Sequence, residues 1–397
     1  MREWRTARLG EVCSFEKNQH IHVGLPYVGL EHIESGTGRF LGTADAVTVK
    51  SATFRFLPSH VLYGRLRAYL NKVFLPDFEG HCSTEIFPIN PGPTISREYL
   101  FHWLSADATV KAIDATSTGA RMPRANMSAV LDLKLPIPPL IEQRRIVALL
   151  DEAFEGIATA KANAEKNLQS ARELFASALA KIFNADWTVV RIADACESIM
   201  DCVNKTAPTV AEATPYKMIR TTNVRNGVVS LVSTNYVSED VFKVWTRRQV
   251  PRRGDVILTR EAPMGEVGML ESDEHVFLGQ RLVSYRADST KLDGRFLLYA
   301  LQSDLLQRQI HALASGSTVQ HMRVPDSKNL QLPLPTLQEQ RDAVAILDAV
   351  RDETSNLATI CSRKLAALAE LKSALLHQAF TGNLITEEAF ALVEARA

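Results

Sequence analysis

Two short basic runs carry the side chains best suited to bind a ligand. Residues 63–72 (YGRLRAYLNK) hold three basic residues interleaved with two tyrosines, and residues 243–253 (KVWTRRQVPRR) hold five basic residues and no acidic one. Lysine and arginine in such clusters suit contact with nucleic-acid phosphates, and an arginine fork or an asparagine amide can also read base edges. Either run alone is more often a solvated charged surface. Their occurrence in both halves of the chain favours nucleic-acid binding.

Known catalytic motifs are missing from the sequence. It holds no G-x-x-x-x-G-K-[ST] phosphate-binding loop and no Asn-Pro-Pro-aromatic motif of adenine methyltransferases. Neither Pro-Asp dipeptide is followed by the spaced acid-x-Lys of a nuclease core. His20 and His22, and His81 beside Cys82, lack a second ligand pair at metal-binding spacing. We therefore predict no catalytic residue and no metal site in this chain.

The elements that must position the basic runs are repeated within the chain. Residues 132–143 (DLKLPIPPLIEQ) match residues 329–340 (NLQLPLPTLQEQ) at an offset of 197, and this offset holds without a gap over residues 119–183 of the first copy. Upstream of that segment the similarity weakens and the offset drifts. The chain is therefore two copies of one unit, whose first part has diverged and whose last part has not.

The similar part of each copy predicts one long helix. From Leu140 to Ile182, apolar residues recur at alternating steps of three and four, which is the seam of a coiled coil. The seam of the second copy is broken by Arg351 and Lys372, and the helix is expected to end at Gly382, which suits a left-handed cap. We predict that the two helices pack on each other as a scaffold.

The divergent parts differ in kind from the helices. Short β-rich runs alternate with turn signals such as Asn226-Gly227, and a helical stretch lies near the end of each part, which together indicate compact α+β domains. Residues 1–139 carry 15 basic and 13 acidic residues and residues 187–335 carry 18 and 16, so each of these segments has a net charge of +2. The predicted segments are two domains at 1–139 and 186–335, long helices at 140–185 and 336–382, and a tail at 383–397.

Composition excludes several classes of protein. The chain has 397 residues, of which 46% are hydrophobic and 23% charged, as in ordinary globular proteins. No apolar stretch is long enough for a membrane-spanning helix, and the first residues lack the apolar region of a secretory signal. The five cysteines form no CxxC pair, which argues against a disulfide framework. We expect a cytoplasmic protein without membrane contact.

The sequence resembles the specificity subunits of type I restriction–modification systems. The resemblance extends over essentially the whole chain. Its carriers are LPIPPLIEQRRIVALLD (135–151), LPLPTLQEQRDAVAILD (332–348), LKSALLHQAFTGNL (371–384), GDVILTREAPMGEVGML (254–270) and VLYGRLRAYLNKVFL (61–75). It implies an α+β fold in which two pseudo-repeat target-recognition domains are separated by an antiparallel coiled coil of the two long helices. It also implies a non-catalytic subunit that reads a bipartite, asymmetric target in double-stranded DNA.

The same resemblance implies partners. They are two methyltransferase (modification) subunits and, for the endonuclease, restriction/translocase subunits. No cofactor is expected in this chain; S-adenosylmethionine, ATP and Mg²⁺ are expected in the partner subunits. Two alternatives remain open: a coiled-coil adaptor with two protein-binding heads and no role in DNA binding, and an orphan specificity subunit without active partners. The missing motifs disfavour a self-contained nuclease or methyltransferase.

The candidate DNA contacts are basic and polar side chains of the two divergent parts. In the first domain they are Arg65, Arg67, Tyr69, Asn71, Lys72, Arg121 and Arg124. In the second they are Arg220, Thr222, Asn223, Arg225, Lys243, Arg247, Arg248, Arg260, His321 and Arg323. Because Arg65 and Arg260 match in the repeat, they are expected to contact phosphate or hold the fold rather than read sequence.

The candidate partner-binding residues lie where each long helix begins. They are Glu142, Gln143, Arg144, Glu339 and Gln340. These polar residues recur in both copies, as a partner surface with two-fold symmetry would require. An alternative for Glu142 and Glu339, which can hold at the same time, is stabilisation of the positive end of the helix dipole.

Overall fold

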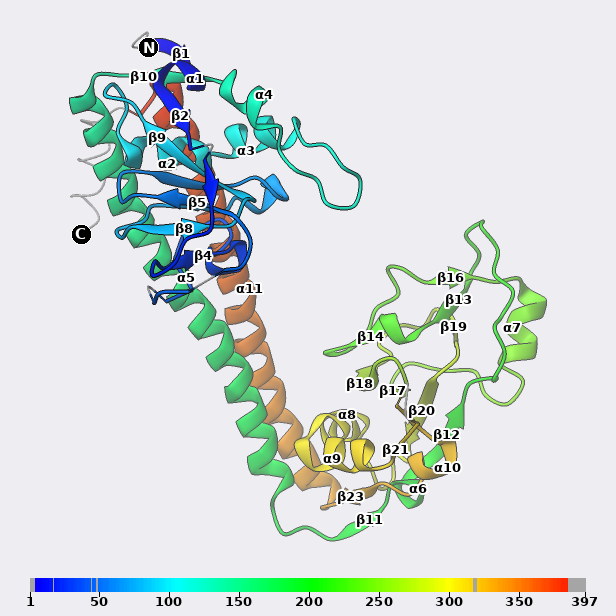
Figure 1. Ribbon diagram of the computed structural model, residues 1–397. Coiled ribbons are helices and arrows are strands. Elements are labelled where there is room, and N and C mark those ends of the chain that lie inside the picture. The colour runs from blue at the N-terminus through cyan, green and yellow to red at the C-terminus, as the bar shows by residue number, and fades with distance from the viewer. Residues whose placement is uncertain (1–3, 17, 44, 48, 317–319, 385–397) are drawn as a thin grey trace. The chain divides into compact units, whose positions relative to one another are not determined.

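The computed structural model describes residues 4–16, 18–43, 45–47, 49–316 and 320–384. The chain divides into two compact units (Figure 1). Unit 1 consists of Met1–Ala164 and Arg363–Ala397, and unit 2 of Glu165–Ser362. Each unit thus takes part of both long helices, whereas the predicted domains stopped where the helices begin. Beyond Leu384, the predicted tail lies outside the described residues.

The two long helices are α5 (Leu140–Phe183) and α11 (Leu337–Thr381). In unit 1 the core residues Ile146 and Leu150 of α5 share a cluster with Leu376 and Ala379 of α11. In unit 2 the cluster holds Leu179, Phe183, Ala343 and Leu347. Since higher numbers in α5 go with lower numbers in α11, the helices run antiparallel in both units.

The two polar breaks in the α11 seam are occupied by cations that lie over aromatic rings. The Arg351 guanidinium lies 5.7 Å from the ring centroid of Tyr299, and the Lys372 ammonium lies 5.2 Å from that of Phe154. Lys372 Nζ also donates to the carbonyl of Gly36 at 2.9 Å, and burial lowers the pKa of this lysine. Cation–π contacts therefore fill the positions where the apolar pattern fails.

Unit 1 contains two four-stranded sheets and one strand pair. The sheet orders are β2-β9-β6-β7 and β3-β5-β8-β4, and β1 pairs antiparallel with β10. The strands are β1 (Arg5–Arg8), β2 (Cys13–Phe15), β3 (Gln19–His20), β4 (Tyr27–Val28), β5 (Thr53–Phe56), β6 (Val61–Gly64), β7 (Val73–Phe74), β8 (Gly80–Cys82), β9 (Ile86–Pro91) and β10 (Lys134–Ile137). The helices are α1 (Leu9–Val12), η1 (Leu30–His32), η2 (Ala68–Leu70), α2 (Arg97–Ser105), α3 (Asp107–Asp114) and α4 (Met127–Leu131).

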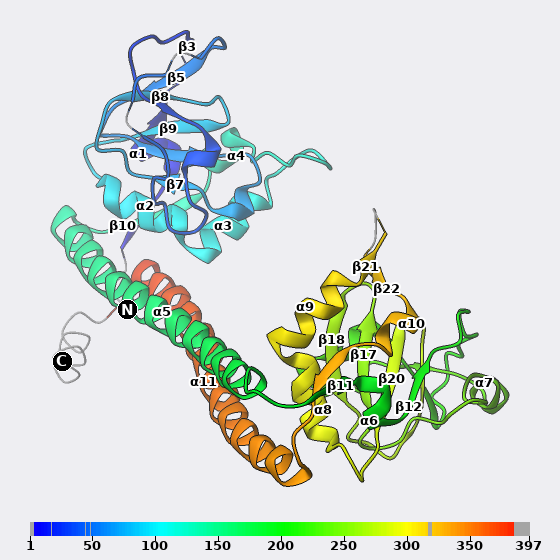
Figure 2. The same ribbon diagram turned by 90° about the horizontal axis from the view of Figure 1, so that it is seen from below.

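Unit 2 contains a six-stranded sheet ordered β12-β20-β17-β18-β15-β14, a three-stranded sheet ordered β16-β13-β19, and the pairs β11-β23 and β21-β22. Helices α8 and α9 lie beside β17, β18 and β20 (Figure 2). The strands are β11 (Val189–Arg191), β12 (Cys196–Asp201), β13 (Tyr216–Ile219), β14 (Val224–Arg225), β15 (Gly227–Val229), β16 (Asn235–Tyr236), β17 (Val256–Arg260), β18 (Met264–Met269), β19 (His275–Leu278), β20 (Leu282–Ala287), β21 (Ala314–Ser315), β22 (His321–Met322) and β23 (Gln331–Pro333). The helices are α6 (Ile192–Ala195), η3 (Thr221–Asn223), α7 (Glu239–Trp245), α8 (Gly294–Gln302), α9 (Asp304–Ala312) and α10 (Val324–Ser327).

The repeat is visible in how each unit closes its core. In unit 1 the ring of Phe380, near the end of α11, lies 5.2 Å from that of Tyr99 in α2. In unit 2 the repeat-related rings of Phe183 and Phe296 lie 5.1 Å apart. The end of a long helix therefore completes the core of each unit in the same way. Within the described residues, no helix is long and apolar enough to cross a membrane.

Candidate nucleic-acid interface

In unit 1, two loops distant in sequence meet beyond the end of β6. We call residues 65–72 and 116–125 the edge loops of unit 1. The backbone N–H of Arg67 donates to the carbonyl of Pro123 at 2.8 Å, and that of Ala125 donates to the carbonyl of Arg65 at 2.9 Å. Arg67 (φ 53°) and Asn71 (φ 47°) both adopt the left-handed backbone conformation. Such costly conformations in non-glycine residues concentrate at functional sites.

A carboxylate from a third segment joins the edge loops. Glu85 accepts from Arg65 Nε at 3.0 Å and from Arg124 Nε at 2.8 Å, and its side chain is only 21% exposed. The Arg65 guanidinium also lies 5.3 Å from the ring centroid of Phe87. Both guanidiniums are therefore paired within unit 1, which is the fold-holding role expected as one alternative for Arg65.

The remaining first-domain candidates divide into inward and outward side chains. Lys72 Nζ donates to the carbonyl of Leu30 at 2.6 Å, and Asn71 Nδ2 donates to that of Ser105 at 3.1 Å, so these two candidates serve the interior. Arg67, Tyr69 and Arg121 are exposed. The guanidiniums of Arg67 and Arg121 have no hydrogen bond or ion pair with any residue that the structure describes, so we call them free.

Unit 2 repeats this backbone arrangement. Arg260, at the end of β17, donates its backbone N–H to the carbonyl of Arg281 at 2.8 Å, as Arg65 does to Glu85 at 2.9 Å. Glu261 forms a bridge with His321, as Leu66 does with Arg124. We call residues 260–264 and the described part of 314–322 the edge loops of unit 2.

The side chains of the unit 2 edge differ from those of unit 1. Arg260 Nη1 donates to the carbonyl of Met322 at 2.8 Å, while the Arg281 guanidinium pairs with Glu261 at 3.2 Å. His321 contacts the hydroxyl of Ser315 at 3.3 Å, and Arg323 pairs with Asp326 at 2.8 Å. The candidates Arg260, His321 and Arg323 therefore all have partners within unit 2.

The polar turn around η3 contains both structural and free residues. Asn223 is 4% exposed; its amide oxygen accepts the backbone N–H of Arg220 at 2.9 Å, and its Nδ2 donates to the carbonyl of Ser230 at 3.0 Å. Its prediction as a DNA contact is wrong, because an asparagine with its amide used inside the turn cannot read a base. Arg220 Nη2 donates to the carbonyl of Ser233 at 3.2 Å, whereas the side chains of Thr222 and Arg225 are exposed and have no partner among the described residues.

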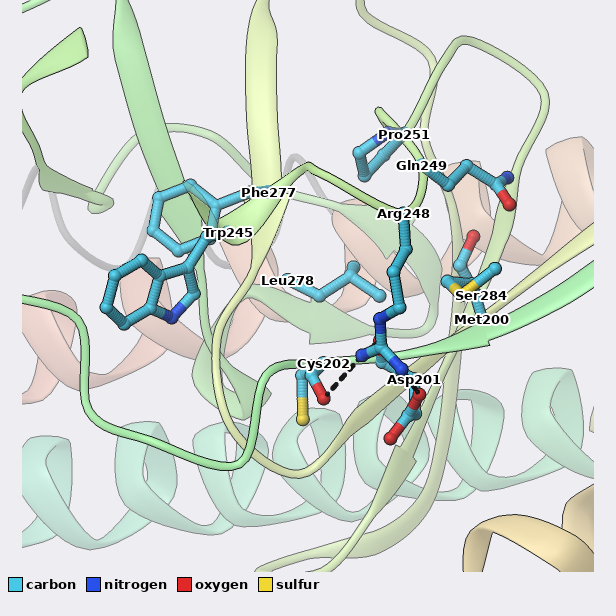
Figure 3. Close-up of a pocket in the computed structure, with 10 residues that line it drawn as sticks. All are labelled: Met200, Asp201, Cys202, Trp245, Arg248, Gln249, Pro251, Phe277, Leu278 and Ser284. Carbon is cyan, nitrogen blue, oxygen red and sulfur yellow. Dashed lines mark hydrogen bonds and ion pairs between the residues drawn. The ribbon is translucent and has the colours of Figure 1, made fainter. Parts of the chain in front are cut away.

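The basic run at 243–253 is largely neutralised. Arg248 reaches into a pocket beside Trp245 and Phe277, where Nη1 donates to Asp201 Oδ1 at 2.7 Å and Nη2 donates to the carbonyl of Cys202 at 3.1 Å (Figure 3). Three further cations of the run have acidic partners. These pairs are Lys243–Glu239, Arg252–Glu197 and Arg253–Asp273. Arg248 is therefore paired within unit 2, and Arg247 is the candidate in this run without a partner in the described part of the chain.

Two of the predicted partner-binding residues are instead buried glutamines that hydrogen-bond to the backbone within their own unit. Gln143 and Gln340 are fully buried. Gln143 Oε1 accepts the backbone N–H of Ser96 at 2.8 Å, and Gln340 Oε1 accepts that of Asp293 at 2.8 Å. Both Nε2 groups donate to carbonyls in repeat-related places. These are Thr94 and Pro138 for Gln143, and Lys291 and Pro335 for Gln340. A partner cannot reach either side chain, so the prediction for these two was wrong.

Other residues of the long helices stay accessible. Arg144 is exposed, and Glu339 is exposed while accepting the backbone N–H of Thr336 at 2.9 Å, which is the capping role that the sequence left open. Leu174 and Leu371, which match at the repeat offset, were not among the candidates from sequence. Both are apolar and exposed, at 55% and 47%. Their agreement in the repeat was the available signal.

The histidine beside Cys82 is buried. His81 contacts the hydroxyl of Thr53 and the carbonyl of Val47, each at 2.9 Å. Among the described residues, no group of three or more histidine, cysteine, aspartate or glutamate side chains is arranged to hold a metal ion.

The chain belongs to the family of type I restriction–modification DNA specificity domains, whose model matches residues 1–168 and 184–361. It is thus a DNA-recognition subunit of a type I restriction–modification system and not itself the catalyst. The two matched segments correspond to the two copies of the internal repeat.

Individual relatives support this assignment. The chain is 23% identical over 411 residues to the type I restriction enzyme MjaVIII specificity subunit of Methanocaldococcus jannaschii, a match that covers 96% of this chain and 93% of that protein. It is 28% identical over 192 residues to the EcoDI specificity subunit of Escherichia coli, where the match covers 47% of this chain and 42% of that protein.

Solved structures agree with the fold. One, from work on complex assembly and conformational transition of the type I R-M system, has a TM-score of 0.80 and 25% identity, covering 97% of this chain and 99% of that one. The HsdS subunit from Thermoanaerobacter tengcongensis has a TM-score of 0.58 and 24% identity, covering 96% and 97% of the respective chains. The predicted family and α+β fold class are therefore confirmed.

Proposed function

We propose that the chain reads a bipartite, asymmetric DNA target, with one half-site for each unit. The observation that carries this proposal is that the two edges share their backbone hydrogen bonds but not their side chains. The carbonyl that accepts from Arg65 belongs to Glu85, and the carbonyl that accepts from Arg260 belongs to Arg281. A duplicated frame with unlike side chains is what two different short sequences require, because base edges are distinguished by side-chain donors and acceptors.

The DNA contacts of unit 1 are Arg67, Tyr69 and Arg121. The two arginines have no partner among the described residues, so binding a phosphate or a guanine edge breaks no internal ion pair. The Tyr69 side chain, at 53% exposed, offers a ring and a hydroxyl in the same edge loop as Arg67. In unit 2 the contacts are Thr222, Arg225 and Arg247, which are exposed and have no side-chain partner among the described residues, and which lie outside the edge loops of that unit.

The partners are two methyltransferase subunits and, in the endonuclease, restriction/translocase subunits. Each unit offers a docking surface of its own, with Leu371 and Arg144 in unit 1 and Leu174 and Glu339 in unit 2, because an accessible apolar side chain repeated in both copies suits two identical partners. S-adenosylmethionine, ATP and Mg²⁺ act in those partners, and the complex works in the cytoplasm.

Mapping of methyladenine in the source genome tests the proposal. With the gene intact we expect one motif made of two short sequences separated by a fixed gap, and deletion of the gene should remove methylation at that motif. A second allele, with residues 1–139 replaced by the corresponding segment of a relative, should change one half of the motif only. An unchanged motif after this replacement would contradict DNA reading by unit 1 and favour an adaptor.

A further inference from the structure

The edge loops of unit 1 are held from a third segment of the chain. Glu85 lies in the turn before β9, and its carboxylate accepts from one arginine of each loop, at 3.0 and 2.8 Å. Its Oε1 takes the Arg124 bond and its Oε2 the Arg65 bond, so each oxygen serves a different loop. One side chain thereby adds a link between residues 65–72 and residues 116–125, beside the backbone hydrogen bonds that Arg67 donates to Pro123 and Ala125 donates to Arg65.

The loops that Glu85 links carry the free cations. Arg67 follows Arg65 by two residues, and Arg121 precedes Arg124 by three. The distance between the Arg67 and Arg121 guanidiniums therefore depends on how the two loops are held together. A charge-assisted hydrogen bond at each oxygen of a carboxylate that is mostly shielded from solvent is stronger than an exposed ion pair.

We infer that Glu85 is a positioning residue for recognition of the unit 1 half-site. It contacts no DNA; it fixes the separation of Arg67 and Arg121 by holding Arg65 and Arg124. This inference rests on the proposed function of unit 1. DNA phosphates would repel an acidic residue on this edge. The inference explains why Glu85 is nevertheless required there: both of its carboxylate oxygens bind arginines of the same unit.

Unit 2 supports this inference by contrast. The residue that corresponds to Glu85 through its backbone hydrogen bond is Arg281, whose guanidinium pairs with Glu261 in the adjacent loop. The position therefore holds a neighbouring loop by an ion pair in both units, although the sign of its charge is reversed. A residue kept only for solubility would have no reason to find an opposite charge in each case.

Hydrogen exchange on the full-length chain tests the positioning step without DNA. In Glu85→Ala we expect the amides of Arg67 and Ala125 to exchange roughly tenfold faster, because the loops open more often when the link is lost. Glu85→Gln keeps the shape and an acceptor oxygen and should lie between wild type and alanine. Exchange in strands β6 and β9 reports whether unit 1 remains folded.

A matched control comes from the same unit. Glu79 accepts from Arg55 Nε at 2.8 Å and has a side chain 38% exposed, but it holds neither edge loop. Glu79→Ala should leave exchange at residues 65–72 and 116–125 unchanged.

Methyladenine mapping with the same alleles at their own locus tests the consequence for recognition. Glu85→Ala should lower methylation of the wild-type motif roughly tenfold and relax the half-site of unit 1, as the loss of a base contact does, while the half-site of unit 2 stays intact. A merely structural role would lower methylation without relaxing one half-site. Unchanged loop exchange, or faster exchange with an unrelaxed motif, would overturn the inference. If wild type methylates no motif, the proposed function fails, and hydrogen exchange still decides whether Glu85 holds the loops.

Discussion

The edges of the two units have the same backbone and opposite charge at one corresponding place. In unit 1 a carboxylate, Glu85, gathers two arginines, and in unit 2 a guanidinium, Arg281, pairs with the carboxylate of Glu261. The backbone bond at this position is 2.9 Å in one unit and 2.8 Å in the other. The reversal of charge keeps an ion pair at this position because the partner in the neighbouring loop carries the opposite charge in each unit.

The interior of the units behaves differently from the edges. His102 contacts Asp151 at 2.8 Å in unit 1, and in unit 2 the repeat-related Tyr299 donates to Asp348. Residue type changes there too, but the acceptor on the long helix stays an aspartate. Substitutions at this position keep a side chain that can hydrogen-bond to the same aspartate of the long helix, whereas at the edges the partner itself changes its charge.

The largest expected effect is on the free energy of unfolding, when the buried Gln143 or Gln340 is replaced. Gln143→Leu leaves the N–H of Ser96 and the carbonyls of Thr94 and Pro138 without their partner, and Gln340→Leu does the same in unit 2. Each variant should lower the free energy of unfolding by about 3 kcal/mol, since an unsatisfied buried polar group costs roughly 1–3 kcal/mol. Denaturant unfolding of the full chain measures both. Clearly unequal decreases in the free energy of unfolding would show that Gln143 and Gln340 are not equivalent.

A charge exchange at the edge should have the next largest effect. Arg281→Glu places the residue type of unit 1 opposite Glu261 in unit 2, and two carboxylates at that distance repel each other. We expect roughly tenfold weaker methylation of the motif, confined to a relaxed half-site of unit 2. The control is Arg253→Glu, a reversal at a cation paired with Asp273 outside the edge loops. Equal effects of Arg281→Glu and Arg253→Glu on methylation would contradict a specific role of Arg281 in recognition by unit 2.

Loss of one free arginine should have a smaller effect. If Arg67 contacts a phosphate, Arg67→Ala reduces the slope of log K against log salt for duplex DNA by about 0.9. Arg5→Ala, at an exposed arginine of β1 outside the edge loops, is the control and should leave the slope unchanged. Fluorescence titration of DNA with the purified chain at several salt concentrations measures the slope. An unaltered slope in Arg67→Ala contradicts a phosphate contact at this residue.

The smallest effect concerns the start of α11. Hydrogen bonds from the side chain and backbone of Thr336 lower the pKa of Glu339 below its ordinary value of 4.5. A carboxyl group whose pKa is lowered by folding stabilises the protein above the unfolded-state pKa, and this contribution is lost as the pH falls through the folded-state value. Thr336→Pro introduces the residue that unit 1 has at Pro139 and removes both donors. Melting temperatures below pH 4.5 should then fall less steeply relative to neutral pH than in wild type; an identical pH profile would contradict this role.

The long helices could be predicted from sequence because their evidence is local. The apolar recurrence and the preceding prolines lie within the segment itself, and α5 begins at the predicted residue 140. The candidate DNA contacts were harder because their partners are distant in sequence. Arg248 is neutralised by Asp201, which lies 47 residues away, and Arg65 by Glu85, which lies 20 away. No run of charges reveals such pairing.

The burial of polar residues could not be predicted from the sequence either. A glutamine beside Glu142 and Arg144 reads as part of an exposed polar surface, yet Gln143 points inward to the backbone that precedes α2. The repeat matched Gln143 to Gln340, and this agreement could have indicated a structural role as easily as a partner surface. The repeat match was visible in the sequence, but only the packing of the two glutamines shows that their role is structural.

The division of the chain between the units has a consequence for synthesis on the ribosome. Unit 2 is one continuous segment, so all of it has been translated once residue 362 is made. Unit 1 still lacks Leu376 and Ala379 of its core at that moment, although most of it was made first. The first half to be translated is therefore the last that can be completed, and its apolar surface must be kept from aggregating until the final helix arrives.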